Sequence, residues 1–348
     1  MPVIYILSTG GTIAATCSES GEYRHAPSRA PRDWRAFAAA RYPGERICDV
    51  NDAHADTPFP AQDSCEFGPA HWRALMRTVG RLQSGNAKAV IILHGTDTMT
   101  YSACALSFLG MTGGAPIIFT GAQRPASEEA SDAHSNIDLA MRAAVGFYGD
   151  LSGECVIAFG GRIIRGVVAS KTSSDAPAAF SSRRLPPIEQ HMTPAAARSA
   201  LREWRRRVPQ RLISAEAAFA DDVACVPLSP GFQVEAFAQR LGHKPPHGVV
   251  FSLYGVGAAP DALRLADLAE RLSAAGVLCL AVSACVDGEI NWNRYKSTQS
   301  LLRSQIVDGG AMSVEAAIVK TMWVAAQPIA FQEKQIMLAR NVAGERQA

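Results

Sequence analysis

The sequence predicts an α/β protein with two domains, each built around a mostly parallel sheet. Short continuous apolar runs alternate with amphipathic segments, which is typical of a parallel sheet covered by helices on both faces. The chain has 348 residues, of which 48% are hydrophobic, and this length suggests about two domains. The alternating pattern is interrupted between residues 180 and 222 and then resumes.

The first domain is expected to contain the larger sheet, flanked by helices. Apolar runs predict its strands, and amphipathic stretches between them predict its helices. Pro69 fits the first turn of its helix, where a missing N–H costs nothing. The strands are expected at residues 3–7, 89–93, 117–120 and 155–159, and the helices at 69–82, 100–110 and 135–146.

The second domain is expected to be a smaller α/β unit. A loop-like stretch precedes it, followed by a basic helical segment at residues 195–207. The arginines of that segment could indicate nucleic-acid binding, but a solvated helix face beside a linker is the simpler interpretation. The strands are expected at 223–228, 249–253 and 277–282, and the helices at 261–274 and from a cap at Ser313 to about 325.

These patterns give the following domain boundaries. We expect an amino-terminal catalytic domain over residues 1–195, a linker over 196–222 and a carboxy-terminal α/β domain over 223–348.

Composition excludes several classes of function. The net charge of +2 is too small to suggest a nucleic-acid partner. The eight cysteines show no CxxC pair and no regular spacing, so we expect reduced thiols and no metal site. The apolar run at residues 3–7 has no basic residues before it and is far shorter than the roughly 20 residues of a membrane span. We therefore expect a soluble cytoplasmic protein with no membrane partner.

Two segments at predicted strand ends carry the main chemical signal. Residues 8–15 (STGGTIAA) follow the first strand, and residues 94–98 (HGTDT) follow the second. Ligands of open α/β sheets bind at the carboxyl ends of the strands, so Thr12 and Thr96 are both candidate nucleophiles. Glycines before Thr12 allow close approach to the main chain, although a simple turn remains an alternative. The GxGxxG spacing of a dinucleotide site is absent.

Three further side chains near these segments have alternative interpretations. Asp97 could orient the neighbouring hydroxyl or bind an ammonium group, and it could also cap the following helix. Lys171 could serve as a general base if its pKa were lowered, or it could be an ordinary exposed lysine. His94 is interpreted as structural, because no GxSxG nucleophile motif accompanies it.

These motifs together resemble the bacterial-type L-asparaginase family, most closely its cytoplasmic type I branch. The likeness extends over most of the chain and depends on several segments in order. Besides 8–14 and 94–98, they are 63–64, 69, 72, 121–125, 131–132, 136–139, 254–257 and 309–316.

The resemblance implies catalytic roles for five residues. Thr12 would attack the side-chain amide and form an acyl-enzyme, and Tyr23 would lie on a mobile loop and help to activate it. Thr96, Asp97 and Lys171 would form a second triad that supports proton transfer. Water would then release aspartate, and the amide nitrogen would leave as ammonia. This agrees with what amide hydrolysis requires: a nucleophile, a proton relay and oxyanion donors.

The resemblance also implies how the amino-acid substrate is bound. Ser64 would bind its α-carboxylate, and Asp97 its α-ammonium group. Cys65 would lie in the same binding loop, at a position where serine or glutamine is usual in the family. Ala258 stands where an asparagine is common. Both departures predict altered affinity or a changed preference between asparagine and glutamine.

The resemblance further implies assembly, and it leaves two alternatives. It implies a homotetramer built as a dimer of dimers, with no metal and no organic cofactor, acting in asparagine metabolism. One alternative is the asparaginase-like subunit of a tRNA-dependent amidotransferase, although this would need a partner and an added amino-terminal domain. The other is a non-catalytic amino-acid-binding module on the same fold.

Overall fold

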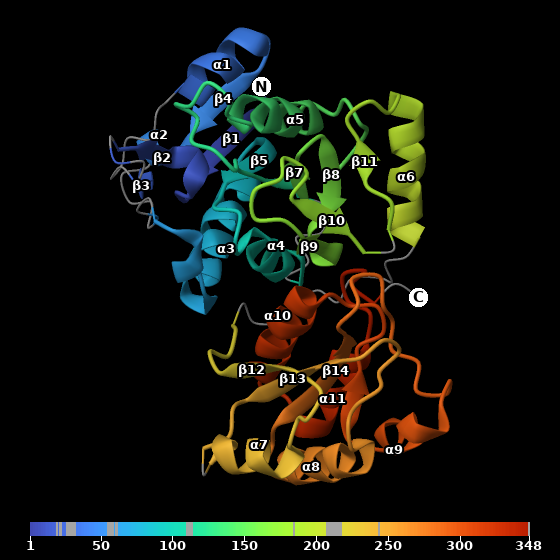
Figure 1. The fold of residues 1–348 in the computed structure, drawn as a ribbon. Helices are drawn as coiled ribbons and strands as arrows, with labels where there is room; N and C mark the ends of the chain where they lie inside the picture. Colours follow the sequence, from blue (N-terminus) through green and yellow to red (C-terminus); the bar gives the residue numbers. More distant parts are fainter. Residues whose placement is uncertain are drawn as a thin grey trace. The chain divides into compact units, whose positions relative to one another are not determined.

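A computed structural model describes the chain in two compact units, residues 1–206 and 207–348 (Figure 1). It describes all residues except 19, 21–22, 26–32, 54–58, 60–61, 109–113, 184, 207–217, 243 and 347–348. Each unit contains its own sheet and helices, so the predicted α/β class with a larger first sheet and a smaller second one is confirmed.

The first unit is built on a seven-stranded sheet with the order β11-β8-β7-β6-β5-β1-β4. The five strands from β7 to β4 run parallel, whereas β8 and β11 are antiparallel to their neighbours. The strands β6 and β7 are buried along their whole length, as their continuous apolar runs predict. The bounds are β1 Val3–Ser8, β4 Arg46–Asp49, β5 Ala87–Leu93, β6 Ile117–Thr120, β7 Cys155–Phe159, β8 Arg162–Arg165 and β11 Ile188–Glu189.

Helices cover both faces of this sheet. In Figure 1, α3 and α4 lie on one side of it and α1 and α5 on the other. The helix α3 begins at Pro69, as expected, and turns Trp72, Leu75 and Val79 inward. The helices are α1 Asp33–Arg41, α2 Val50–Ala53, α3 Pro69–Ser84, α4 Met99–Phe108, α5 Ala133–Ala144 and α6 Pro194–Arg206.

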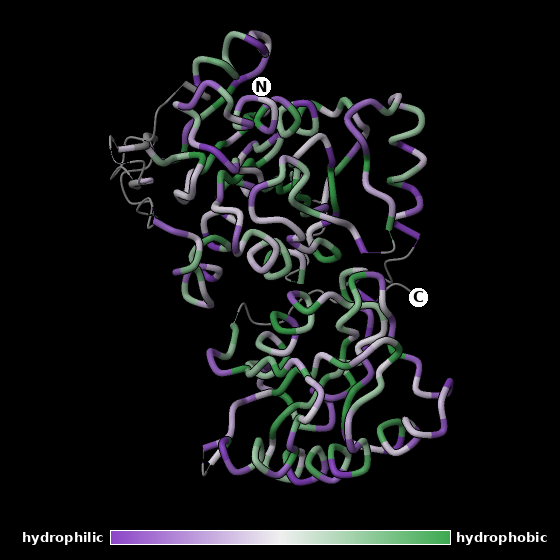
Figure 2. The backbone as a smooth tube through the Cα atoms, in the orientation of Figure 1, coloured by the Kyte–Doolittle hydropathy of each residue, from purple (hydrophilic) through white to green (hydrophobic). Residues whose placement is uncertain are grey.

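The second unit has a parallel sheet with the order β12-β13-β14-β15. In Figure 2 the central strands of both units are largely hydrophobic, and hydrophilic segments gather in the outer loops and helices. Ser313 caps α10 as predicted, because its side chain accepts the N–H of Ala316 at 3.1 Å. The elements are β12 Val223–Pro227, α7 Val234–Leu241, β13 Gly248–Leu253, α8 Ala262–Ala274, β14 Leu278–Ser283, α9 Gln299–Leu302, β15 Ile306–Asp308, α10 Val314–Ala325 and α11 Phe331–Ala339.

The structure adds elements that the sequence pattern did not predict. Besides β4, β8 and β11, two short hairpins belong to the first unit: β2 Ala15–Cys17 with β3 Tyr23–His25, and β9 Ala169–Lys171 with β10 Phe180–Ser182. Strands of three residues are too short to produce a detectable hydrophobic period.

The segment expected to be a linker, residues 196–222, overlaps an ordered helix. Its first part belongs to α6, which is counted with the first unit and buries Leu201 and Trp204. Residues 207–217 lie outside the described residues. The domain boundaries therefore stay a prediction.

Among the described residues, none of the helices combines the length and the apolar composition that a membrane crossing requires.

Candidate active site

The carboxyl ends of β1 and β5 approach each other so closely that only glycine fits between them. A Cβ atom on Gly11 would lie 2.3 Å from the Cα of Gly95, and Gly11 has a φ of +77°. Both facts exclude an ordinary side chain at this position. Because Thr12 follows Gly11 and Thr96 follows Gly95, the two threonine segments are neighbours at one sheet edge, as predicted.

The turn that carries Thr12 is held by backbone hydrogen bonds. The N–H of Gly11 donates to the carbonyl of Gln62 at 3.0 Å, and the N–H of Ala14 donates to the carbonyl of Gly11 at 3.0 Å. A short 3-10 helix, Thr12–Ala14, begins at this point. Thr12 is half-buried, so its side chain combines a fixed backbone with partial access to solvent.

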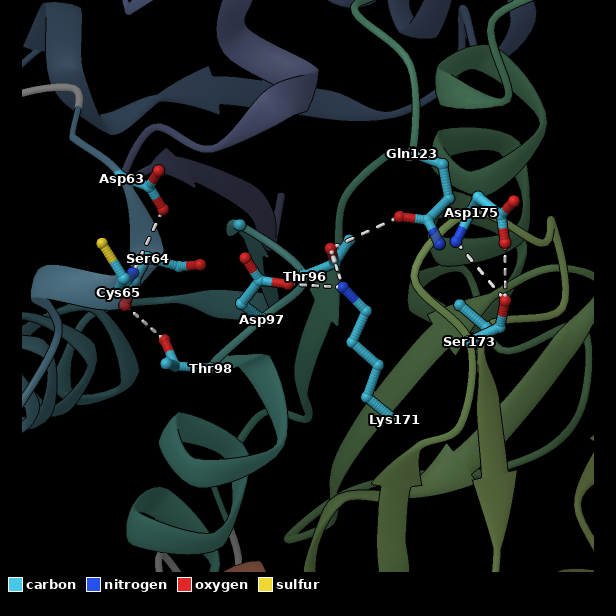
Figure 3. Close-up of polar contacts among 12 residues, drawn as sticks. Asp63, Ser64, Cys65, Thr96, Asp97, Thr98, Gln123, Lys171, Ser173 and Asp175 are labelled. Carbon is cyan, nitrogen blue, oxygen red and sulfur yellow. Dashed lines mark hydrogen bonds and ion pairs between the residues drawn. The ribbon is translucent and has the colours of Figure 1, made fainter.

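Lys171 reaches the second threonine segment from the hairpin β9–β10. Its Nζ donates to Thr96 Oγ1 at 2.8 Å and to Asp97 Oδ1 at 2.6 Å (Figure 3). The Lys171 side chain is 16% exposed, whereas that of Asp97 is 66% exposed. The structure therefore brings Thr96, Asp97 and Lys171 together, and the alternative of an ordinary solvated lysine does not apply.

Gln123 is a polar neighbour of Thr96 to which the sequence assigned no role. Thr96 Oγ1 donates to Gln123 Oε1 at 3.4 Å, and Gln123 Nε2 donates to the carbonyl of Ala176 at 3.3 Å. The backbone N–H of Gln123 is in turn held by the Asp132 carboxylate at 2.9 Å. Gln123 follows β6, the strand next to β5, and ligands of such sheets bind at the carboxyl ends of the strands. This position could have identified Gln123 as a candidate site residue.

The backbone N–H of Thr96 is a further feature of this segment. No acceptor for it exists among the described residues. An unused backbone donor at the edge of a sheet is the kind of group that stabilises an oxyanion.

Ser64 lies against the Gly95 backbone on a separate turn, the 3-10 helix Ser64–Glu66. A Cβ atom on Gly95 would lie 2.7 Å from Ser64 Oγ. In Figure 3 the Ser64 hydroxyl points towards Asp97, whereas the thiol of Cys65 points away. Cys65 is exposed, and its Sγ donates to Glu66 Oε1 at 3.8 Å. The substrate-binding roles of Ser64 and Cys65 stay predictions.

Tyr23 and Ala258 lie in other parts of the chain. Tyr23 belongs to β3, a strand that contacts the 3-10 helix beginning at Thr12, and it is 47% exposed. Ala258 belongs to the second unit, on the loop after β13, where its N–H donates to the carbonyl of Tyr254 at 2.9 Å. The expected roles of both residues stay predictions.

His94 is buried and fully hydrogen-bonded. Its Nδ1 lies 2.8 Å from the carbonyl of Gly95, and its Nε2 lies 3.0 Å from Ser102 Oγ, which accepts a hydrogen bond from Trp72 Nε1 at 3.1 Å. Burial lowers the pKa of His94 to about 4, so the ring is neutral near pH 7. These contacts support the structural interpretation of His94.

The part of the chain that the structure describes contains no group of three His, Cys, Asp or Glu side chains that could hold a metal ion.

Two family models match the chain. "Asparaginase, N-terminal" matches residues 3–200, and "Glutaminase/Asparaginase C-terminal domain" matches residues 222–338. Together they span both structural units.

Individual relatives divide between two activities. L-asparaginase 1 of Escherichia coli K12 is 26% identical over 347 residues, covering 98% of this chain and 97% of its own length. A subunit of the glutamyl-tRNA(Gln) amidotransferase of Pyrococcus furiosus is 30% identical over 359 residues, covering 99% of this chain and 77% of its own length.

A solved structure agrees in fold. The thermostable L-asparaginase from Thermococcus kodakarensis superposes with a TM-score of 0.79 at 24% identity, covering 99% of both chains. With both family models matched along the chain, this protein belongs to the asparaginase family.

Proposed function

We propose that this protein is an L-asparaginase that hydrolyses L-asparagine to L-aspartate and ammonia through a threonine acyl-enzyme. The main supporting observation is the contact of Lys171 Nζ with both Thr96 and Asp97, next to the turn that carries Thr12. A lysine in contact with a hydroxyl and a carboxylate, beside a second hydroxyl, provides the groups that amide hydrolysis needs.

The proposed reaction has two steps. Thr12 Oγ1 bonds to the amide carbon, the C–N bond breaks, and the nitrogen leaves as ammonia after taking up the proton of Thr12. Water then attacks the ester carbon, aspartate leaves, and Thr12 recovers its proton. Lys171 supports proton transfer through Thr96, and the free N–H of Thr96 stabilises the oxyanion in both steps.

In this proposal the amino-acid end of the substrate lies between Ser64 and Asp97. The Ser64 hydroxyl binds the α-carboxylate, and the Asp97 carboxylate, which is 66% exposed, binds the α-ammonium group. Tyr23 closes over the substrate from β3 and helps to activate Thr12. A cytoplasmic homotetramer completes the proposal and rests on the family resemblance alone.

A second candidate is the amidotransferase subunit, which the identity to the Pyrococcus furiosus protein favours. Measuring ammonia release from asparagine and from glutamine, each with and without glutamyl-tRNA, separates the candidates. We expect release from free asparagine without any partner protein. Release that requires glutamyl-tRNA and a partner would favour the second candidate, and no release at all would favour a non-catalytic binding module.

The nucleophile is tested by substitution of Thr12. Thr12→Ala is expected to lower kcat by a factor on the order of 10⁴ or more, because the covalent step is lost. Thr12→Ser, the matched control, retains a hydroxyl and is expected to keep measurable turnover. The thermal midpoint should change little in either variant, and near-normal kcat in Thr12→Ala would refute the assignment.

A further inference from the structure

The carbonyl of Ser64 is held by two hydrogen bonds, one local and one from a distant segment. The N–H of Phe67 donates to it at 2.9 Å and closes the short turn. Thr98 Oγ1 donates to it at 2.6 Å, across 34 positions of the chain. The second bond links the turn that carries Ser64 to the segment that carries Thr96 and Asp97 (Figure 3).

Thr98 uses its hydroxyl in an unusual way for its position. It immediately precedes α4, and its carbonyl accepts the N–H of Ser102 at 3.1 Å. A threonine before a helix ordinarily uses its side-chain oxygen to accept an N–H of the first turn. Because a carbonyl can only accept, Thr98 must donate its proton to Ser64. Helix capping requires only an oxygen, whereas this contact requires the hydroxyl proton.

We propose that Thr98 is a positioning residue for substrate binding, which sets the spacing between the Ser64 hydroxyl and the Asp97 carboxylate. The inference rests on the proposed function, in which these two groups hold the two charged ends of the amino acid. Ser64 is 2% exposed and lies against Gly95, so its hydroxyl has little freedom once its carbonyl is fixed. Thr98 itself does not touch the substrate.

The test is the isosteric variant Thr98→Val, which removes the hydroxyl and keeps the shape. We expect KM for asparagine and Kd for L-aspartate to rise about five- to tenfold, the loss that corresponds to one intramolecular hydrogen bond. The value of kcat should change less than about twofold, because the triad of Thr96, Asp97 and Lys171 is untouched. Thr98→Ser restores the donor and should return KM and Kd close to the wild-type values.

Thr120→Val is the matched control for a purely structural effect. Thr120 Oγ1 donates to the carbonyl of Ala158 at 2.7 Å and joins β6 to β7. Thr120→Val therefore loses a hydroxyl-to-carbonyl hydrogen bond of the same kind as the one that Thr98→Val loses. We expect Thr98→Val and Thr120→Val to lower the thermal midpoint by similar amounts, and Thr120→Val to leave KM and Kd unchanged.

Two outcomes would overturn the inference. Wild-type KM in Thr98→Val would do so, as would an equal rise of KM in Thr98→Val and Thr120→Val, because a general loss of stability would then explain it. If the wild-type protein neither binds aspartate nor releases ammonia from asparagine, the proposed function itself fails. A wild-type enzyme that is active, with KM unaltered in Thr98→Val, removes only the role of Thr98.

Discussion

Two lysine–carboxylate pairs, one in each unit, have the same N–O distance and opposite surroundings. Lys171 and Asp97 in the first unit are 2.6 Å apart, and the Asp97 side chain is 66% exposed. Lys320 and Glu345 in the second unit are also 2.6 Å apart, and both side chains are 0% exposed. The two pairs therefore differ in burial and not in the N–O distance.

Other groups of the protein also bind the buried pair. Lys320 also donates to the carbonyl of Arg340, and Glu345 accepts the N–H groups of Val342 at 3.0 Å and Ala343 at 2.7 Å. Burial opposes ionisation of Glu345, but the Lys320 ammonium and these N–H groups hold its pKa below the usual range. The pair fastens Glu345 to α10, and its complete burial closes it to a ligand from solvent.

The exposed pair is open on its carboxylate side. The only side-chain partner of Asp97 among the described residues is Lys171, which contacts one of its two oxygens. Because most of the Asp97 side chain faces solvent, it can exchange water for a charged ligand at little cost. The comparison predicts that Lys171 matters for turnover and Lys320 for stability.

Of the variants in these two pairs, Lys171→Met is expected to have the largest effect, and that effect is on turnover. We expect kcat to fall by about 10²–10⁴-fold, the range of general acid–base contributions. The free energy of unfolding should change by less than about 1 kcal/mol, because the exposed Asp97 carboxylate stays hydrated. Steady-state ammonia release and urea unfolding measure the two quantities.

Lys171→Arg separates charge from proton transfer. Arginine keeps the positive charge beside Asp97 but is not deprotonated in proteins. We expect it to remain as impaired in kcat as Lys171→Met. A kcat within tenfold of wild type in both variants would contradict a role for Lys171 in proton transfer.

Lys320→Met should show the opposite pattern. Removing one partner leaves Glu345 charged and unpaired in the interior, which costs about 3–5 kcal/mol of unfolding free energy. The value of kcat/KM per folded molecule should stay near that of wild type. Urea unfolding together with active-site titration measures both quantities.

The double variant Lys320→Met, Glu345→Gln tests the cause of that loss. It removes both charges and keeps an oxygen that can accept the N–H groups of Val342 and Ala343. Replacing a buried pair by uncharged groups is often nearly neutral, so most of the stability should return. A single variant that costs less than about 1 kcal/mol would show that the buried pair is not the anchor we infer.

The sequence predicted that the two threonine segments meet at one sheet edge, but its own pattern did not predict the contact between Lys171 and Asp97. The apolar runs of β1 and β5 and the glycines after them were enough to bring Thr12 and Thr96 to one edge. The approach of Lys171 was not predictable from its own pattern, because it depends on the short hairpin β9–β10. Its expected role came from the family resemblance.

The buried pair was not predicted at all. Lys320 lies within the apolar helix α10, and its partner Glu345 is 25 residues further along the chain. Periodicity identifies which face of a helix is buried, but it does not say which distant carboxylate neutralises a lysine there. Thr98 and Gln123 were missed for the same reason, since their partners belong to other elements.

His94 extends the comparison to a buried ionisable group inside the candidate site itself. It precedes Thr96 by two residues, yet burial keeps it neutral and lowers its pKa to about 4. In the unfolded chain a histidine has a pKa of about 6.5. Below that pH the unfolded state binds more protons than the folded state, so stability falls as pH decreases.

We therefore expect His94 to cost the protein about 3 kcal/mol of unfolding free energy between about pH 6.5 and pH 4, and nothing above pH 7. Urea unfolding of wild type and His94→Gln across this range measures it. The variant is less stable at pH 7, because the contacts with Gly95 and Ser102 change, but its stability should decline less steeply in acid. Parallel pH curves for the two proteins would contradict a neutral, buried His94 and would reopen a chemical role for it. If the stabilities of wild type and His94→Gln instead draw together only below pH 6.5, His94 has a structural role. It would then differ from Thr96 and Asp97, for which we propose roles in the reaction.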